Sequence, residues 1–278
     1  MAAVTPRSLG LGALTLLNFV FVFGTGVEFV RFVSFRAIYH NLSGPGGAPQ
    51  CRDSVGWAEA LRRRSVLSSM CVDGGLILLF ALQHSALAWP PLKRLCQAGL
   101  GVLHRGFYTF TTALTLQVLM RCWQPVSGAP CLWSVSGAPW DTWLPLLCFI
   151  LHFLCWMVIC SILLIFDYAE LLGIKQVYYH CLGLGDPLSM KSPRAQRLFS
   201  HLRHPVFVEL CVVLWALPCL PLDRLLLAVG LTTYLALGHS LDTQDCAYLH
   251  AQLRSKLQLF SQPVMGEGGA SSTNHKTD

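Results

Sequence analysis

The chain has 278 residues, of which 54% are hydrophobic and 12% are charged, and its mean hydropathy is +0.52. A soluble domain carries about 25% charged residues, so this composition excludes an ordinary cytosolic enzyme, a disordered chain and a coiled coil. The formal net charge of +6 suits loops that face anionic lipid, and it does not by itself indicate binding to nucleic acid. We therefore expect an all-α, polytopic membrane protein whose first partner is the lipid bilayer.

Six segments are apolar enough to predict transmembrane helices, which need roughly 20 mostly apolar residues each. They cover residues 9–33, 66–88, 107–120, 143–166, 205–220 and 222–238. The first is too long for the core of a signal peptide and is predicted to stay as a span. The last two are short and flank a turn at Pro221, which is typical of a tight hairpin. Together they predict one transmembrane helical domain over residues 1–260.

The ends and loops of the chain predict its orientation and its tail. With six spans, one side of the membrane holds 12 of the 20 Lys and Arg residues, which places both termini on the cytosolic or nucleoplasmic side. The Asn41 sequon then faces the lumen, and Cys122 and Cys131 lie near that side, where a disulfide between them is left open. Residues 261–278 have no periodic apolar positions and predict a disordered tail.

Placing an ionisable residue inside an apolar span costs free energy, so such residues usually have a partner or a function. Glu28 and Arg31 stand three positions apart on one predicted helix, close enough to form an ion pair. His84 fits two interpretations equally, an interhelical hydrogen bond or a ligand contact. His152 is alone on an apolar face, which favours a hydrogen-bonded histidine of the core.

The densest polar cluster precedes the fifth predicted span. Pro205 suits the first turn of a helix, which places Arg203 and His204 at the helix mouth and Glu209 one turn inside. An antiparallel hairpin would bring Asp242 back toward them. The cluster is thus either a composite polar pocket for an anion or a cofactor carboxylate or a basic loop that reaches lipid headgroups. No pair has CxxC spacing and no matching ligands accompany the histidines, so no metal site is expected.

Several stretches of the sequence are similar to a known family. GTGVEFVRF at residues 24–32, LLFALQHS at 78–85 and long stretches over 166–188 and 191–210 resemble the nurim family of multi-pass proteins of the inner nuclear membrane. The resemblance covers roughly residues 20–260. It implies an inner nuclear membrane location, with nuclear-envelope or lamina proteins as partners and no nucleic acid.

The same residues resemble a wider superfamily of integral membrane methyltransferases, which includes isoprenylcysteine carboxyl methyltransferase and methanethiol S-methyltransferase. Gln83–Ser85 is similar to its QHS pattern, Arg203–Pro205 to its RHP element, and Asp242 to part of its C-terminal acidic pair. The chain departs from the pattern at Phe207 and Glu209, where the superfamily has tyrosine and glycine. The resemblance implies a helical bundle similar to those membrane methyltransferases.

Two functions follow from these resemblances. The first is a multi-pass inner nuclear membrane protein that its transmembrane core retains at the nuclear envelope. The alternative is a methyltransferase that uses S-adenosylmethionine on a thiol or carboxylate of a small or lipid-borne acceptor. The residues implied at the cofactor are Arg203, His204, Pro205, Glu209 and Asp242, and those implied on the acceptor side are Glu28 and His84.

Overall fold

The computed structural model describes residues 5–39, 56–126, 129–135, 137–201, 204–238 and 243–261. These residues are mainly helical, and an isolated β-bridge joins Ser134 to Cys219. The chain divides into two compact units, Met1–Leu241 and Asp242–Asp278. The first unit contains the helix bundle, and the described part of the second is a single helix.

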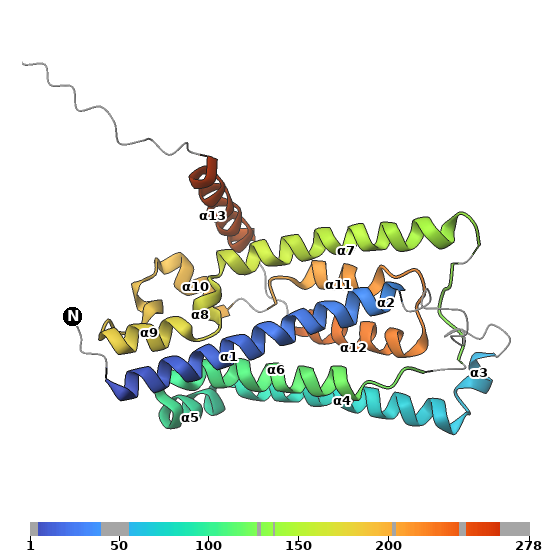
Figure 1. Ribbon diagram of the computed structural model, residues 1–278, viewed down its shortest axis with the longest axis horizontal. Coiled ribbons are helices and arrows are strands. Elements are labelled where there is room, and N and C mark those ends of the chain that lie inside the picture. Colours follow the sequence, from blue (N-terminus) through green and yellow to red (C-terminus); the bar gives the residue numbers. More distant parts are fainter. Residues whose placement is uncertain are drawn as a thin grey trace, which may run out of the picture. The chain divides into compact units, whose positions relative to one another are not determined.

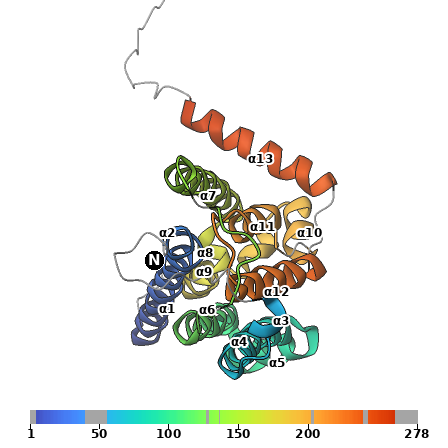
Figure 2. The same ribbon diagram turned by 90° about the vertical axis from the view of Figure 1, so that its right-hand side faces the viewer.

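The bundle combines longer helices with shorter ones (Figure 1). The longer ones are α1 (Pro6–Val30), α4 (Arg64–Ala88), α6 (His104–Cys122), α7 (Trp140–Ile165) and α12 (Leu222–Gly238). The shorter ones are α2 (Arg36–Tyr39), α3 (Trp57–Ala60), α5 (Pro90–Leu100), α8 (Tyr168–Leu171), α9 (Ile174–Leu182), α10 (Pro193–His201) and α11 (Phe207–Trp215), with 3-10 turns η3 (Gly101–Leu103) and η4 (Pro187–Met190). The second unit holds α13 (Thr243–Ser261). Figure 2 shows the bundle helices of the first unit end-on.

The predicted spans correspond to helices of unequal length. Three segments are long and apolar enough to cross a membrane, Pro6–Tyr39, Arg64–Ala88 and Trp140–Ile165, and a fourth is counted if Leu222–Gly238 and Thr243–Ser255 are taken together. The all-α, polytopic class is therefore confirmed, but six full spans are not. The 205–220 segment differs most, because its helix α11 has nine residues and reaches only about 14 Å.

Helix α6 has 19 residues but is not apolar enough to count as a membrane span. Its packing explains why it carries polar side chains. Its Thr111 and Gln117 side chains do not face lipid. Thr111 Oγ1 accepts a hydrogen bond from Gln83 Nε2 of α4 at 2.9 Å, and Gln117 Nε2 donates to Thr25 Oγ1 of α1 at 3.1 Å. Polar pairs between neighbouring helices thus hold α6 between α1 and α4.

The first helix begins and continues through identifiable local features. Thr5 and Ser8 cap each other's backbone N–H groups, and Pro6 occupies the first turn, where its missing N–H is not needed. After Val30 one π-helical turn, η1 (Arg31–Phe35), leads into α2. The helical segment therefore extends to Tyr39, beyond the predicted end at residue 33.

The main apolar core joins the central helices of the bundle. It contains Ile77 of α4, Leu119 of α6, Val213 of α11 and Leu227 of α12, each at most 8% exposed. His152 of α7 lies among these helices at 1% exposure, 2.9 Å from both Ser34 Oγ and the Ala216 carbonyl oxygen. The prediction of a hydrogen-bonded core histidine is confirmed.

The segment between α6 and α7 is attached to the segment before α12. The Leu132 N–H donates to the Leu220 carbonyl, and the Leu220 N–H donates to the Trp133 carbonyl. Cys131 is disulfide-bonded, while Cys122 is a free cysteine, so the two do not form the disulfide that the sequence left open. The Asn41 sequon and residues 262–278 of the predicted tail lie outside the described residues.

Candidate functional site

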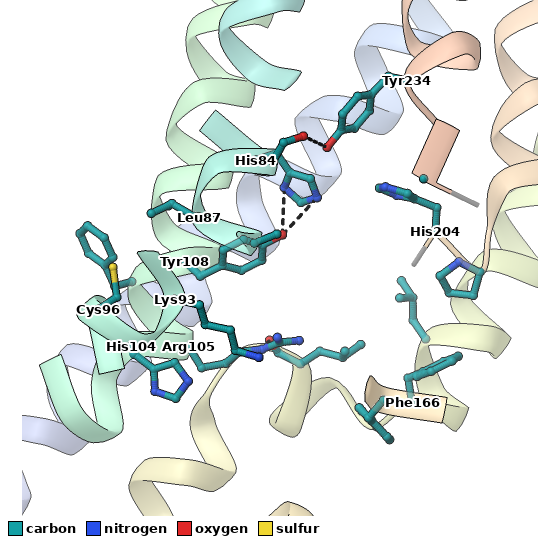
Figure 3. A pocket seen from close by; sticks show the side chains of 18 of the residues that line it. His84, Leu87, Lys93, Cys96, His104, Arg105, Tyr108, Phe166, His204 and Tyr234 are labelled. Atoms are coloured by element: carbon teal, nitrogen blue, oxygen red, sulfur yellow. Dashed lines mark hydrogen bonds between the residues drawn. The ribbon is translucent and has the colours of Figure 1, made fainter. Parts of the chain in front are cut away.

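A cavity of about 570 Å³ opens in the first unit where α4, α7 and α12 end and α6 begins (Figure 3). Its wall combines two kinds of polar side chain. One group is aromatic or imidazole, and the other is basic. The aromatic and imidazole group contains His84, Tyr108, His204 and Tyr234. The basic group contains Lys93, His104 and Arg105.

The aromatic group surrounds His84 of α4. The Tyr108 hydroxyl lies 3.1 Å from His84 Nε2 and 3.2 Å from Nδ1, and the Tyr234 hydroxyl lies 3.2 Å from Ser85 Oγ. The ring centroids of His84 and His204 are 5.9 Å apart, and those of His204 and Tyr234 are 5.6 Å apart. Figure 3 shows these rings turned toward one open space. Such π faces attract a cationic group.

His204 occupies its place through two backbone features. Its φ of 53° lies in the left-handed region that few non-glycine residues adopt, which often marks a functional position. A Cβ atom at Gly238 would stand 2.8 Å from His204 Cδ2, so only glycine leaves room for this imidazole ring. The end of α12 and the turn before α11 therefore fix the ring jointly.

Arg105 is positioned by a close approach of two glycines. Gly173, with φ of 85°, comes so near to α6 that a Cβ there would lie 2.8 Å from the Gly106 N atom. This contact places the Leu171 carbonyl 3.0 Å from Arg105 Nε, which donates to it. The terminal nitrogens of Arg105 have no hydrogen bond among the described residues, and the guanidinium carbon lies 5.8 Å from the centroid of the Tyr108 ring.

Two carboxylates behind Arg105 are each paired with a lysine. Lys191 Nζ lies 2.7 Å from Glu170 Oε2, and Lys175 donates to Asp167. Burial alone would raise the pKa of Asp167, but the hydrogen bond from Lys175 and the charges of Lys175 and Lys191 lower it below its ordinary value. The same hydrogen bond raises the pKa of Lys175. Each carboxylate thus has a lysine within ion-pair distance.

The structure brings together some of the residues that the sequence implied and separates others. His84, His204 and Pro205 line the cavity. Glu209 lies on α11 and is not among the described lining residues, and Glu28 lies away from the cavity. Arg203 and Asp242 lie outside the described residues.

Glu28 has a different partner from the one expected. Its carboxylate lies 3.0 Å from Arg121 Nη2 of α6, and the described residues show no ion pair between Glu28 and Arg31. The expected pair is therefore wrong. The π-helical turn begins at Arg31, which changes the helical phase there, and the packing of α1 on α6 supplies a cation from another helix.

Polar lining residues that were not among the predicted site residues include Lys93, His104, Arg105, Tyr108 and Tyr234. The one available signal was the basic, amphipathic segment between the second and third predicted spans. It forms α5 and the start of α6, directly beside His84. Tyr108 and Tyr234 resemble ordinary span residues, because a tyrosine at the end of a helix is common at membrane interfaces.

The described residues contain no group of three or more His, Cys, Asp or Glu side chains that could hold a metal ion. The cavity can instead bind an organic molecule. Its aromatic side suits a cation, and its basic side suits an anion.

These features define the chain as a polytopic, all-α membrane protein with a polar ligand-sized cavity at one end of its bundle. The chain is 66% identical to nurim of Danio rerio over 274 residues, 99% of both chains. It is 56% identical to nurim of Homo sapiens, over 91% of this chain and 95% of that one, and 55% identical to nurim of Xenopus laevis, over 92% and 89%. The chain belongs to the nurim family. No protein-family model and no solved structure matches it.

Proposed function

We propose that this chain is a multi-pass protein of the inner nuclear membrane, retained at the nuclear envelope by its transmembrane core, with both termini in the nucleoplasm. The observation that carries the proposal is the distribution of structure along the chain. The first unit contains helices α1 to α12, whereas the described part of the second is the single helix α13. Because most of the described residues belong to the bundle, we assign contacts with nuclear-envelope or lamina proteins to the bundle and its short basic loops.

Localisation of tagged proteins tests this proposal. A chain that lacks residues 243–278 should still concentrate at the nuclear rim, because its bundle is intact. A matched chimera that joins residues 243–278 to an unrelated membrane span should spread through the endoplasmic reticulum. The opposite result, with the chimera at the rim and the truncated chain dispersed, overturns the proposal.

We further propose that the cavity binds S-adenosylmethionine, which supplies a methyl group on a positively charged sulfur for transfer to a thiol or carboxylate. The aromatic faces of Tyr108, His204 and Tyr234 suit that sulfonium, which supports the proposal. His84, which lies 3.4 Å from Thr112 Oγ1 and close to the Tyr108 hydroxyl, is placed to accept a proton from a thiol acceptor. Neither Phe207 nor Glu209, where the chain departs from the superfamily, is among the described lining residues.

Equilibrium binding of S-adenosylmethionine to the purified full chain tests the second proposal. His204→Ala should weaken binding at least about tenfold, because it removes an aromatic wall of the cavity. His180→Ala is the matched control, because His180 is an exposed histidine of α9 outside the described lining. A folded protein that does not bind, or one in which His204→Ala binds normally, overturns the proposal.

A further inference from the structure

A second cavity, of about 430 Å³, lies beside the first on the other side of the start of α6. Its wall is almost wholly apolar and comes from α1, the end of α5, η3, α6, Gly173 and α9. Leu14 and Leu17 of this wall are 52% and 69% exposed, so the groove is open to the lipid that surrounds α1. An acyl chain is the natural occupant of such a groove.

Asn18, in the wall of the groove, has a side-chain oxygen without a hydrogen-bond partner. Asn18 Nδ2 lies 3.2 Å from the Gly106 carbonyl and 3.3 Å from Thr109 Oγ1, while Asn18 Oδ1 is buried without a hydrogen-bond partner. A buried acceptor without a donor costs about 1–3 kcal/mol. A ligand that carries a hydroxyl at this point would satisfy it.

The two cavities meet at the first turn of α6. Phe107 lines both of them, and its neighbours divide between them, with Arg105 in the larger cavity and Gly106 in the groove. Asn18 lies at this junction through its hydrogen bond to Gly106. Phe107 and this hydrogen bond therefore place the two cavities next to each other.

The large cavity is cationic on the side that faces this junction. Lys93 and Arg105 line it, and among the described lining residues there is no Asp or Glu. In Figure 3 both side chains extend toward the middle of the cavity. Glu170 and Asp167 each lie within ion-pair distance of a lysine, and the described residues show no salt bridge between Arg105 and a carboxylate, although the charge of Glu170 acts on Arg105. An ammonium and a guanidinium together are typical ligands of phosphate.

We propose that the two cavities bind one single-chain lipid phosphate that carries a free hydroxyl, such as a lysophospholipid. The chain lies in the groove, the hydroxyl donates to Asn18 Oδ1, and the phosphate is bound by Lys93 and Arg105. The phosphate would then lie at the level of the lipid headgroups. Helix α4 ends at Ala88, and the next residue, Trp89, is 61% exposed, as tryptophans at the membrane interface are. The proposal does not depend on S-adenosylmethionine or on a methyl transfer.

Binding of 1-oleoyl-glycerol-3-phosphate to the full chain, delipidated in detergent and without S-adenosylmethionine, is the test. Lys93→Gln should weaken binding about tenfold through the loss of a charge-assisted contact. Its neighbour Arg94 is also exposed but does not line the cavity, so Arg94→Gln should change the affinity less than about twofold. Equal effects of the two variants would show only a general attraction to positive charge and overturn the phosphate site.

The groove is tested by a second matched pair. Leu17→Trp fills the groove and should weaken binding at least about fivefold, whereas Leu16→Trp places the same ring on an exposed residue outside it and should have little effect. Arg105→Lys, which keeps the charge but loses the planar fork, should weaken binding while the protein stays folded. If Leu17→Trp binds normally, the chain is not in the groove and the proposal fails.

Competitors identify the source of the phosphate. Monooleoylglycerol and glycerol-3-phosphate should compete at least about tenfold more weakly than the lipid phosphate, because each lacks one of its two binding elements. If glycerol-3-phosphate or inorganic phosphate competes equally, the ligand is a free phosphate compound. If dioleoyl phosphatidic acid binds as tightly, the groove does not select a single chain. Either result overturns the proposal.

Discussion

The two ends of the bundle use polar residues in opposite ways. At the cavity, His84, His204 and Arg105 are partly exposed, and the terminal nitrogens of Arg105 have no hydrogen bond among the described residues. Toward the other end, Asp223 and His152 are at most 2% exposed. Asp223 Oδ2 and both ring nitrogens of His152 have partners on other segments, while Asp223 Oδ1 is buried without a hydrogen-bond partner. Enclosed polar groups that contact other segments stabilise a fold, whereas partly exposed ones can also be reached by a ligand.

The enclosed end is organised around Asp223 and Arg224 at the start of α12. Asp223 Oδ2 accepts a hydrogen bond from Trp123 Nε1 at 3.1 Å. Arg224 donates to the Phe32 carbonyl at 3.2 Å, and its guanidinium lies 4.3 Å from the centroid of the Phe32 ring. Asp73 of α4, at 0% exposure, accepts from the Gln124 N–H at 2.9 Å. These contacts join η1, α4, the segment after α6 and the start of α12.

The largest effect is expected at Asp223. Asp223→Ala leaves the buried Arg224 without its nearest carboxylate and Trp123 without its acceptor, which should cost about 3–5 kcal/mol of folding free energy. Thermal unfolding in detergent measures the loss. Asp186→Ala, which removes a carboxylate that caps an exposed turn, is the control and should cost about 1 kcal/mol. Equal losses would contradict the distinction between the two ends.

His152→Ala should cost about 2–4 kcal/mol, because it leaves a cavity in the core and two unsatisfied hydrogen-bond partners. Lipid phosphate binding by the fraction that stays folded should be unchanged, since His152 is not among the described lining residues of either cavity. Unfolding and binding assays on one preparation measure both. A specific loss of binding would mean that the two ends are coupled.

Gly173→Ala should cost about 1–3 kcal/mol and also weaken lipid phosphate binding, because the new Cβ pushes against the Gly106 backbone and moves Arg105. Gly183→Ala is the matched control. Gly183 also has a positive φ, of 70°, but an added Cβ there would meet no atom within 4 Å. Its substitution should therefore cost about 1 kcal/mol of stability and leave binding unchanged. Similar binding in both variants would argue against the role given to the glycine contact.

The smallest effect concerns the Asp167–Lys175 pair, whose side chains are about a third exposed. Because the pKa of Asp167 is lowered on folding, its stabilising effect is present above its ordinary value of 3.8 and is lost as the pH falls through the folded value. The pKa of Lys175 is raised on folding, so its stabilising effect is present below its ordinary value of 10.5. That effect is lost as the pH rises through the folded value. Lys175→Met should abolish the loss of folding free energy at high pH and reduce the loss at low pH. Each change should be less than about 1 kcal/mol. Unfolding measured across pH checks this.

Much of the fold could be predicted from the sequence, because hydropathy is a local property. The segments at residues 9–33, 66–88 and 143–166 correspond to α1, α4 and α7, the helices that are apolar on most sides. The prediction was poorest for 205–220, where apolar composition continued past Trp215 although the helix did not. There the chain leaves the helix to pair with the segment around Trp133, a contact that local composition does not indicate.

The candidate site was only partly predictable, for the same reason. His84, His204 and Pro205 stand out as polar or helix-breaking residues next to apolar spans, so they could be chosen singly. Arg105 could not, since its position depends on the approach of Gly173 to Gly106, which are far apart in the chain. Likewise, Glu28 has an obvious neighbour in sequence but pairs with Arg121.

By itself the sequence determined the class of this protein, its family and most of its long helices, because the cost of placing polar groups in lipid acts on each segment separately. Only the tertiary structure decided which polar side chains are enclosed and which face a cavity. The reason is helix packing, which places some polar groups beside a partner on another helix and others at the wall of a cavity.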